Sequence, residues 1–361
     1  MKNVRIAILG TGSMAEQHVK HFKAISGCKV VAGIDVEEAR SRAFCTKAGI
    51  GHAFGSLETA LQWDGFDAVA NVTPDAVHHP TTMQLIAANK HVFCEKPLAE
   101  NFLLADEMTR EADTAGLVAM VNLVYRNVPQ IQKARALVLA GTIGELRHVE
   151  ASYRQSWLVS NAWGDWRTED RWLWRLSEAH GSKGVLGDIG IHILDFVTYG
   201  VGVEPVSLQA RLKTFPKAEG DRIGSYTLDA NDSFVMTVEF PNGALGVIHA
   251  SRFMTGYANT LRLHVFGNKG AIEIDHGSKA TTMRICAGED VHKETWRDVL
   301  CESVPSNYEK FVAAIRAGHN DEPSFRRAAA LQRLLDVCFD AGATGDRRSA
   351  PFGPSSPHTS R

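Results

Sequence analysis

The segment GVLGDIGIHILDFV, residues 184–197, is almost entirely apolar but contains three side chains that could take part in acid–base chemistry. They are Asp188, His192 and Asp195, at positions i, i+4 and i+7. On an α-helix this spacing places all three along one stripe, with apolar residues around the rest of each turn. Such a helix would hold a carboxylate and an imidazole one turn apart, and both groups can accept and release a proton.

Asp188 and His192 suit proton transfer from a substrate hydroxyl. An imidazole, with an ordinary pKa of about 6.5, can act as a general base near neutral pH. We therefore expect His192 to be the base, and Asp188 to orient it or to accept a hydrogen bond from the reacting hydroxyl. Alternatively, Asp188 could cap a helix through the N–H of Gly190 or Ile191, and His192 could be a half-buried structural histidine. We expect Asp195 to be structural. No metal site is expected, because third and fourth ligands are not evident.

A glycine-rich motif lies near the start of the chain. The residues AILGTGSMA, 7–15, form G-x-G-x-x-A directly after a predicted strand and directly before a predicted helix. In this context Gly10 allows a tight turn, Gly12 lets a pyrophosphate approach the backbone, and Ala15 permits close helix packing. The N–H groups at the helix N-terminus would then bind the phosphates. The cofactor-binding residues expected here are Gly10, Gly12, Ser13 and Met14.

An acidic residue, Asp35, ends the next predicted strand, residues 29–35. A carboxylate at this position accepts a hydrogen bond from the 2′-hydroxyl of a ribose and repels a 2′-phosphate. The three residues that follow, Val36, Glu37 and Glu38, include no arginine that could bind such a phosphate. The sequence therefore predicts a dinucleotide site that prefers NAD to NADP.

The composition is that of a folded protein with balanced charge. The chain has 361 residues, 44% of them hydrophobic, which allows a sizeable core and suggests about two domains. Its 39 basic and 41 acidic residues argue against nucleic acid or an anionic membrane as a partner. The six cysteines form no C-x-x-C pair, which favours reduced thiols in the cytoplasm. We expect no signal peptide and no membrane-spanning segment.

The first part of the chain alternates apolar strands with helical patterns, and this predicts a parallel sheet covered on both faces. We expect an N-terminal Rossmann domain over residues 1–123, in the α/β class. The predicted strands are 4–10, 29–35, 66–73, 91–97 and 117–123, with helices that include 14–25 and 81–90.

The remaining chain no longer alternates single strands with helices. A helix near 128–144 leads into alternating strands joined by short glycine-bearing turns at 241–243 and 267–270. We expect an α+β domain over residues 124–342, with a large, open and mainly antiparallel sheet that binds the substrate. A helix at 324–340 would precede a tail, residues 343–361, that is rich in Pro and Ser.

Four motifs occur in an order that resembles one enzyme family. Together they are similar to the glucose–fructose oxidoreductase, inositol dehydrogenase and rhizopine catabolism (Gfo/Idh/MocA) family, over residues 4 to about 340. The motifs are the glycine-rich segment 7–15, TPDAVHHP (73–80), KHVFCEKPLA (90–99) and GVLGDIGIHILD (184–195).

The resemblance implies an NAD(P)-dependent dehydrogenase of a sugar or cyclitol. Lys96 and the D-x-x-x-H pair would be catalytic, with the ammonium group of Lys96 on the substrate oxygen. The sequence departs from the family pattern at Asn89, where a glycine is usual, and at Lys183, which interrupts a common glycine triplet. The implied catalytic residues are Lys96, Asp188 and His192, and the residues implied along the cofactor are Thr73, Pro74, His78, Glu95 and Lys96.

Residues 153–175 contain five of the seven tryptophans and four arginines. Aromatic faces stack on sugar rings, and guanidinium groups bind carboxylate or phosphate. The same residues could instead form a core, a subunit interface or a solvated ion-pair surface. We expect at least one of them to contact the substrate. The expected substrate-binding residues are Lys96, Asn122, Tyr125, Arg126, Arg154, Trp163, Trp174, Arg175, Asp188 and His192.

Three functions fit these residues. The first is a dehydrogenase that reduces NAD by oxidising a secondary hydroxyl. The second is a redox-neutral glycosidase, in which transient oxidation allows elimination of an aglycone, including that of an anionic sugar glycoside. The third is a non-catalytic NAD-dependent sugar sensor, which the proton-handling residues argue against. We also expect a homo-oligomer, a dimer or tetramer, formed through the C-terminal sheet.

Overall fold

The computed structural model describes residues 3–350, which form two compact units. The first unit contains the residues up to 127 together with 304–333. The second contains 128–303 together with the described residues from 334 onward. The segment 304–333, which the sequence pattern places in the second domain, therefore packs within the first unit.

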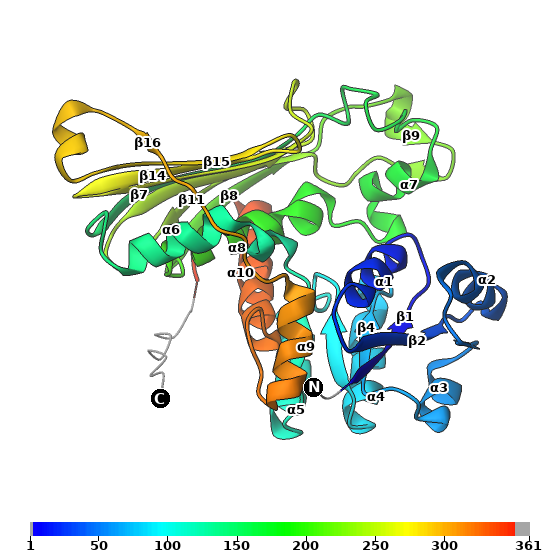
Figure 1. Cartoon of the computed structure of the whole chain (residues 1–361). Coiled ribbons are helices and arrows are strands. Elements are labelled where there is room, and N and C mark those ends of the chain that lie inside the picture. Colours follow the sequence, from blue (N-terminus) through cyan, green and yellow to red (C-terminus); the bar gives the residue numbers. More distant parts are fainter. Residues whose placement is uncertain (1–2, 351–361) are drawn as a thin grey trace. The chain divides into compact units, whose positions relative to one another are not determined.

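The first unit is built around a six-stranded parallel sheet in the order β3-β2-β1-β4-β5-β6. Its strands β1, β2 and β4 are labelled in Figure 1. This is the strand order of a Rossmann fold, as the sequence predicts. Ile6, Ala7 and Ile8 of β1 are all fully buried, because helices cover both faces of the sheet. The strands are β1 (Val4–Leu9), β2 (Cys28–Ile34), β3 (His52–Phe54), β4 (Ala68–Asn71), β5 (His91–Cys94) and β6 (Ala119–Val121).

The helices of this unit include one that returns from late in the chain. Helix α9 contributes Tyr308 and Phe311 to the core, where their rings lie 5.0 Å from Phe22 and 5.2 Å from Phe93. These aromatic contacts explain why the segment belongs to the first unit. The helices are α1 (Ala15–Lys23), α2 (Glu38–Ala48), α3 (Leu57–Trp63), α4 (Asp75–Ala87), α5 (Phe102–Thr114), the 3₁₀ turn η1 (Val124–Asn127) and α9 (Asn307–Ala317).

The second unit is built around a nine-stranded sheet in the order β16-β15-β14-β13-β7-β12-β11-β8-β17. Neighbouring strands are antiparallel except β7 and β12, which are parallel. The strands are β7 (Leu146–Gln155), β8 (Ser207–Lys213), β11 (Ser233–Glu239), β12 (Leu245–Ser251), β13 (Asn259–Gly267), β14 (Gly270–His276), β15 (Thr281–Ala287), β16 (Arg297–Asp298) and β17 (Arg348–Ser349). A separate ribbon pairs β9 (Arg222–Ile223) with β10 (Tyr226–Thr227).

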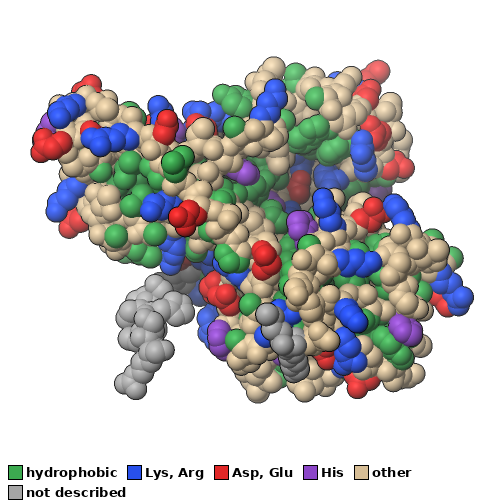
Figure 2. All heavy atoms as spheres, in the orientation of Figure 1, with side chains coloured by type: hydrophobic (Ala, Val, Ile, Leu, Met, Phe, Trp, Pro, Cys, Tyr) green, Lys and Arg blue, Asp and Glu red, His purple; other side chains and the backbone are tan. Residues whose placement is uncertain are grey.

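One face of this sheet packs against helices α6 (Pro129–Leu139) and α8 (Ile191–Val201). Val149, Ala151 and Tyr153 of β7 are buried toward them, whereas Glu150 is exposed on the other face. That other face is mixed in character, because exposed Val235 and Leu245 share it with charged and histidine side chains. Across the view in Figure 2, basic and acidic side chains are interspersed.

Two expectations about helices need correction. The segment 184–197 is not one uniform α-helix, because residues Leu186–Gly190 form a π-helical turn (η4) before α8 begins. The last helix, α10 (Phe325–Thr344), runs into the predicted tail, and Arg348–Ser349 pair with β8. The rest of that tail, residues 351–361, lies outside the described residues. No helix in residues 3–350 is both long and apolar enough to cross a lipid bilayer.

Candidate active site

The loop after β1 has the shape that a nucleotide requires. Gly10 has φ +89°, and a Cβ atom there would lie 2.7 Å from the carbonyl oxygen of Val72, so only glycine fits. A Cβ atom on Gly12 would meet no protein atom within 4 Å, so the space beside it is open. Helix α1 begins after Met14, which supplies no side-chain cap. Its first N–H groups are therefore suited to bind phosphate.

Asp35 follows β2, and its carboxylate accepts five hydrogen bonds. Thr11 donates its N–H and its hydroxyl to Oδ2 at 2.9 and 2.8 Å, and the N–H of Glu37 donates to Oδ1 at 3.0 Å. Arg40 binds side-on, with Nε 3.0 Å from Oδ2 and Nη2 2.6 Å from Oδ1. Burial alone would raise the pKa of Asp35, but hydrogen bonds from Arg40 and Thr11 hold it well below the usual range.

A cation contacts Asp35, although the sequence has no arginine among the three residues that follow it. Arg40 lies on the first turn of α2 and reaches back to the carboxylate. Its side chain is 46% exposed and also approaches Glu37 Oε1 at 3.0 Å. A ribose 2′-hydroxyl that binds Asp35 must therefore share the carboxylate with Arg40.

A buried cluster positions Glu95, which precedes Lys96 at the carboxyl end of β5. Glu95 Oε1 accepts hydrogen bonds from Nε2 of His18 at 2.8 Å and from Nδ2 of Asn122 at 2.7 Å. The N–H of Lys96 lies 3.3 Å from Oε2. Burial alone would raise the pKa of Glu95, but the hydrogen bond and charge of His18, then the Asn122 hydrogen bond, lower it to about 2. The hydrogen bonds to Glu95 therefore hold the backbone at the start of Lys96 in place.

Three further expected residues lie near this cluster. Asn122 is buried, and its Nδ2 also lies 3.1 Å from the hydroxyl of Tyr308, so its described contacts are with Glu95 and Tyr308. Burial raises the pKa of Tyr308. Tyr125 and Arg126 lie on the turn η1, where Tyr125 is half-buried and Arg126 is buried.

His78 connects two turns at the same edge of the sheet. Its ring nitrogens lie 2.8 Å from the carbonyl oxygens of Thr73 and Pro97, and the ring is fully buried. Thr73 donates its hydroxyl to Asn71 Oδ1 at 2.7 Å, and Pro74 precedes helix α4. Because β1, β4 and β5 are parallel neighbours, the glycine loop, these turns and Lys96 all follow the carboxyl ends of the strands.

Asp188 lies on the π-helical turn of the second unit, and its carboxylate contacts two arginines. Nη2 of Arg252 donates to Oδ2 at 3.1 Å, and Nε of Arg175 lies 3.9 Å from the same oxygen. The side chain of Asp188 is 30% exposed. Helical geometry already precedes it at Val185, and no side-chain cap is formed at this turn, so helix capping does not explain Asp188. π-Helical turns are frequent at functional sites.

His192 and Asp195 follow on α8. His192 is 8% exposed, and its ring centroid lies 6.5 Å from that of Tyr153 on β7. Asp195 is more deeply buried. The second unit therefore brings Asp188, His192 and Arg175 into one region of helix and loop.

Most of the tryptophan-rich segment forms a small core. Trp157 stacks on Trp172 at 5.2 Å between ring centroids, and Trp172 stacks on Trp163 at 6.1 Å. Trp157 and Trp166 are buried among leucines. Trp174 is 38% exposed, and its ring lies 4.5 Å from the guanidinium of Arg175. Arg175 is thus the member of this segment that approaches Asp188, and Trp174 is an exposed tryptophan that stacks on Arg175.

The structure does not bring Arg154 to helix α8. It follows Tyr153 on β7, so its side chain lies on the opposite face of the sheet from the ring of His192. There it donates to Ser152 Oγ at 2.9 Å and stacks on Tyr257 at 4.8 Å.

Comparison with known proteins assigns this arrangement to a family. Residues 4–123 match the oxidoreductase family with an NAD-binding Rossmann fold, and residues 131–273 match the GFO/IDH/MocA C-terminal domain. The chain belongs to the Gfo/Idh/MocA oxidoreductases. Its first unit is therefore an NAD-binding domain, and the open space at Gly12, the start of α1, which no side chain caps, and the carboxylate of Asp35 fit that cofactor.

Relatives within the family share about a quarter of their residues with this chain. A levoglucosan dehydrogenase from Pseudarthrobacter phenanthrenivorans is 24% identical over 83% of this chain and 80% of its own length. A myo-inositol 2-dehydrogenase from Thermotoga maritima is 28% identical over 78% of each chain. An oxidoreductase domain protein from Kribbella flavida, 28% identical, superposes with a TM-score of 0.84 over 98% of this chain and 100% of its own. The complex of levoglucosan dehydrogenase with NADH and L-sorbose shows the same fold, with a TM-score of 0.85 at 21% identity over 97% and 100% of the two chains.

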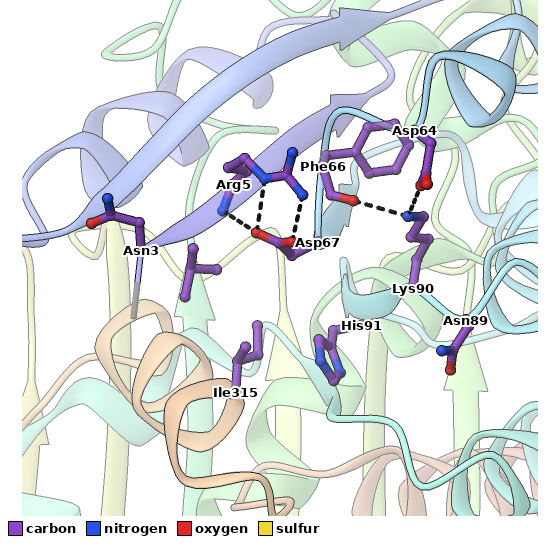
Figure 3. A pocket seen from close by; sticks show the side chains of 10 residues that line it. Asn3, Arg5, Asp64, Phe66, Asp67, Asn89, Lys90, His91 and Ile315 are labelled. Atoms are coloured by element: carbon purple, nitrogen blue, oxygen red, sulfur yellow. Dashed lines mark hydrogen bonds and ion pairs between the residues drawn. The ribbon is translucent and has the colours of Figure 1, made fainter. Parts of the chain in front are cut away.

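A cavity of about 290 Å³ lies at the opposite edge of the Rossmann sheet (Figure 3). It is lined by residues that precede β4 and β5, and its cations already have partners. Arg5 binds Asp67 in a bidentate pair, and Lys90 binds Asp64 and the carbonyl of Phe66. Because ligands of this fold bind at the carboxyl ends of the strands, this cavity is not the family's nucleotide site.

Sequence reasoning missed three residues of the candidate site. Arg40 could have been found, because it lies only two positions beyond Glu38, on the first turn of the next helix. His18 and Arg252 carry no motif, and each lies more than 60 positions from the carboxylate that it contacts. Only the packing of distant elements identifies them.

Proposed function

We propose that this protein is an NAD-dependent dehydrogenase that oxidises a secondary hydroxyl of a sugar, a sugar derivative or a cyclitol. The observation that carries this proposal is the ionic contact of Asp188 with two arginines, four residues before His192, in a chain of this family. The names of relatives give the substrate class its support: levoglucosan dehydrogenase, myo-inositol 2-dehydrogenase and 1,5-anhydro-D-fructose reductase.

In this proposal each catalytic side chain has a separate task. His192 accepts the proton of the substrate hydroxyl, for which an imidazole is suited near neutral pH. The ammonium of Lys96 holds the same oxygen and stabilises its developing negative charge. Asp188 accepts a hydrogen bond that orients the hydroxyl or His192. When bound, the nicotinamide supplies the acceptor for the hydride.

The first unit contributes residues that bind the cofactor in this proposal. The backbone around Gly10, Gly12, Ser13 and Met14 would hold the pyrophosphate, and Asp35 the adenosine ribose. Thr73 and Pro74 would line the nicotinamide end, His78 would hold their turn through the carbonyl oxygen of Thr73, and Glu95 would fix the segment that carries Lys96. These assignments are supported by the hydrogen bonds that hold each turn at the carboxyl edge of the sheet.

Substrate recognition would fall to Trp174 and Arg175, with Tyr125 and Arg126 as further candidates. An exposed indole can stack on a sugar ring, and a half-exposed guanidinium can bind a hydroxyl or an acidic group. Trp163, Arg154 and Asn122 are less suited to direct contact, because Trp163 belongs to the aromatic stack, Arg154 lies on the other sheet face, and Asn122 is buried.

The experiment is a substrate panel with wild-type protein and NAD. Cyclitols, hexoses, anhydro-sugars, acidic sugars and aryl glycosides are each incubated while NADH absorbance and aglycone release are followed. NADH formation with at least one polyol supports the proposal. Aglycone release without net NADH would replace it with a redox-neutral glycosidase, and NAD binding without turnover on any compound would favour a sensor.

The assembly and the location also remain proposals. We propose a homo-oligomer that associates through the open face of the nine-stranded sheet, where Val235 and Leu245 are exposed. We further propose a cytoplasmic location, supported by six cysteines that are all free thiols in the structure. A functional division close to residue 123 is proposed for the nucleotide-binding and substrate-binding domains, with residues 304–333 added to the former.

A further inference from the structure

Arg252 is a fully buried cation that no step of the proposed reaction uses. It directly follows β12, and its side chain has 0% exposure. Nη2 donates to Asp188 Oδ2 at 3.1 Å, and Nη1 donates to the carbonyl oxygen of Arg175 at 3.0 Å. Its guanidinium also lies 4.9 Å from the ring centroid of Trp157. One face of the guanidinium and both of its terminal nitrogens thus contact the region around Asp188.

A buried guanidinium needs a carboxylate, because the charge loses its hydration. Burial lowers the pKa of Arg252, and the charge of Asp188, followed by that of Asp232, raises it again. Nε of Arg252 has no hydrogen-bond partner in the described part of the chain. Asp188 is therefore the carboxylate that binds this cation directly.

A second buried pair stands behind Arg252. Nζ of Lys217 lies 2.8 Å from Oδ2 of Asp232, and both side chains are almost completely buried. The N–H of Phe215 donates to the same oxygen at 2.8 Å, and the N–H of Arg252 donates to the carbonyl oxygen of Asp232 at 3.1 Å. Because the carboxylate of Asp232 binds Lys217, Asp232 lies close to Arg252 without being its side-chain hydrogen-bond partner.

Charges of opposite sign therefore alternate from the interior to the candidate site. The order is Lys217, Asp232, Arg252, Asp188 and Arg175. Only the last two side chains have substantial exposure. Both arginines approach the same oxygen of Asp188, Oδ2, so this oxygen is held from two directions.

We propose that Arg252 is a positioning residue that holds the carboxylate of Asp188 in place for the substrate. It acts through Asp188 and does not touch the substrate itself. The inference rests on the proposed function, in which Asp188 accepts a hydrogen bond from the reacting hydroxyl or from His192. Stacking on Trp157 also links this arginine to the tryptophan core beside the site.

The kinetic test compares Arg252→Met with Arg252→Lys. Loss of the cation should lower kcat at least tenfold, whereas lysine, which keeps the charge but not the fork, should recover part of that loss. NAD affinity, measured by calorimetry, should stay within twofold in both variants, because the nucleotide is held by the first unit. A matched control is Arg262→Met, which breaks an Arg–Asp pair on the same sheet, with Asp275 at 2.6 Å. The control should change kcat less than twofold.

A stability cycle makes the ion pair testable without turnover. Melting temperatures are measured for Arg252→Met, for Asp188→Asn and for the double variant. Asp188→Asn leaves Arg252 without its direct carboxylate, and Arg252→Met leaves Asp188 with the longer contact to Arg175. The double variant removes both charges of the pair, so it should melt higher than the sum of the two losses predicts. The double variant also serves if Arg252→Met alone folds poorly.

The outcomes separate the two proposals. If the wild type oxidises no compound in the panel, the proposed function fails, and the stability cycle still measures the Arg252–Asp188 contact. If the decreases in melting temperature of the two single variants add up to that of the double variant, the Arg252–Asp188 ion pair does not stabilise the fold. A kcat for Arg252→Met within twofold of wild type, or a loss that lysine does not reduce, overturns the positioning role even when the cycle shows coupling.

Discussion

The guanidinium of Arg40 binds the carboxylate of Asp35 side-on, through two hydrogen bonds of 3.0 and 2.6 Å. Asp35 is the residue that is expected to receive the ribose of NAD, and Thr11 and Glu37 donate to the same two oxygens. Because a carboxylate has about four lone-pair sites, these five donors already saturate it. Cofactor binding must therefore displace Arg40 or share Asp35 with it.

The first prediction concerns this competition. Arg40→Gln should lower the Kd for NAD about two- to fivefold, since a partly exposed pair is worth up to about 1 kcal/mol. The same substitution should also lower the affinity for NADP, because the 2′-phosphate would lose the arginine beside Asp35. Calorimetric titration with both cofactors measures this. Arg42→Gln is the control, because Arg42 pairs with Glu38 on the same helix and does not contact Asp35. An unchanged NAD affinity in Arg40→Gln would contradict the competition.

Asp35 should still decide the preference for NAD over NADP. Asp35→Ser removes the negative charge that repels a 2′-phosphate and releases Arg40 to bind it. The ratio of kcat/KM for NAD to that for NADP should therefore fall by at least tenfold. Wild-type protein that used NADP as well as NAD would refute the preference itself.

His192→Ala should reduce kcat by about 10²- to 10⁴-fold, which is the usual contribution of a positioned acid–base group. The Kd for NAD should change little, because His192 belongs to the second unit. Steady-state kinetics on the substrate that the panel identifies, together with calorimetry, provide the measurement. Near-full activity of this variant would exclude His192 as the base.

Asp188→Asn should slow turnover at least tenfold and also lower the melting temperature. The second effect follows from Arg252, whose buried charge would lose its direct carboxylate partner. Helix capping would predict a different result, because asparagine caps a helix as well as aspartate does. If the rate and the melting temperature of this variant were both unchanged, Asp188 would have only the role of a helix cap.

The Glu95 cluster makes a prediction about pH. The pKa of the Glu95 carboxyl is about 2 in the folded protein, against an ordinary value of 4.5, so the folded state favours its charged form. The contribution of ionised Glu95 to the stability of the fold is complete above pH 4.5 and is lost as the pH falls toward 2. Glu95→Gln should therefore lower the melting temperature by several degrees at pH 7, and the difference from wild type should shrink between pH 4.5 and 3. A difference that stays constant over this range would contradict it.

The amino-acid sequence by itself determined the fold class, the parallel sheet of the nucleotide-binding half except its edge strand β3, and the nature of the cofactor. These features depend on local signals: buried apolar strands, a glycine pair at a turn, and an acid at the end of the second strand. The D-x-x-x-H pair was also visible in the sequence, because four-residue spacing on a helix brings Asp188 and His192 to one side. Even there, the π-helical turn was not predictable, since it depends on how residues 186–190 pack.

Tertiary structure decided which charges face one another. Arg252 lies 64 positions after Asp188, and His18 lies 77 positions before Glu95, so no local pattern connects them. The same is true of Tyr308, which joins the Rossmann core although the strands of the other unit separate it from that core in the sequence. Burial forces such distant charged and polar groups to find partners, and only the folded chain shows which partners they find.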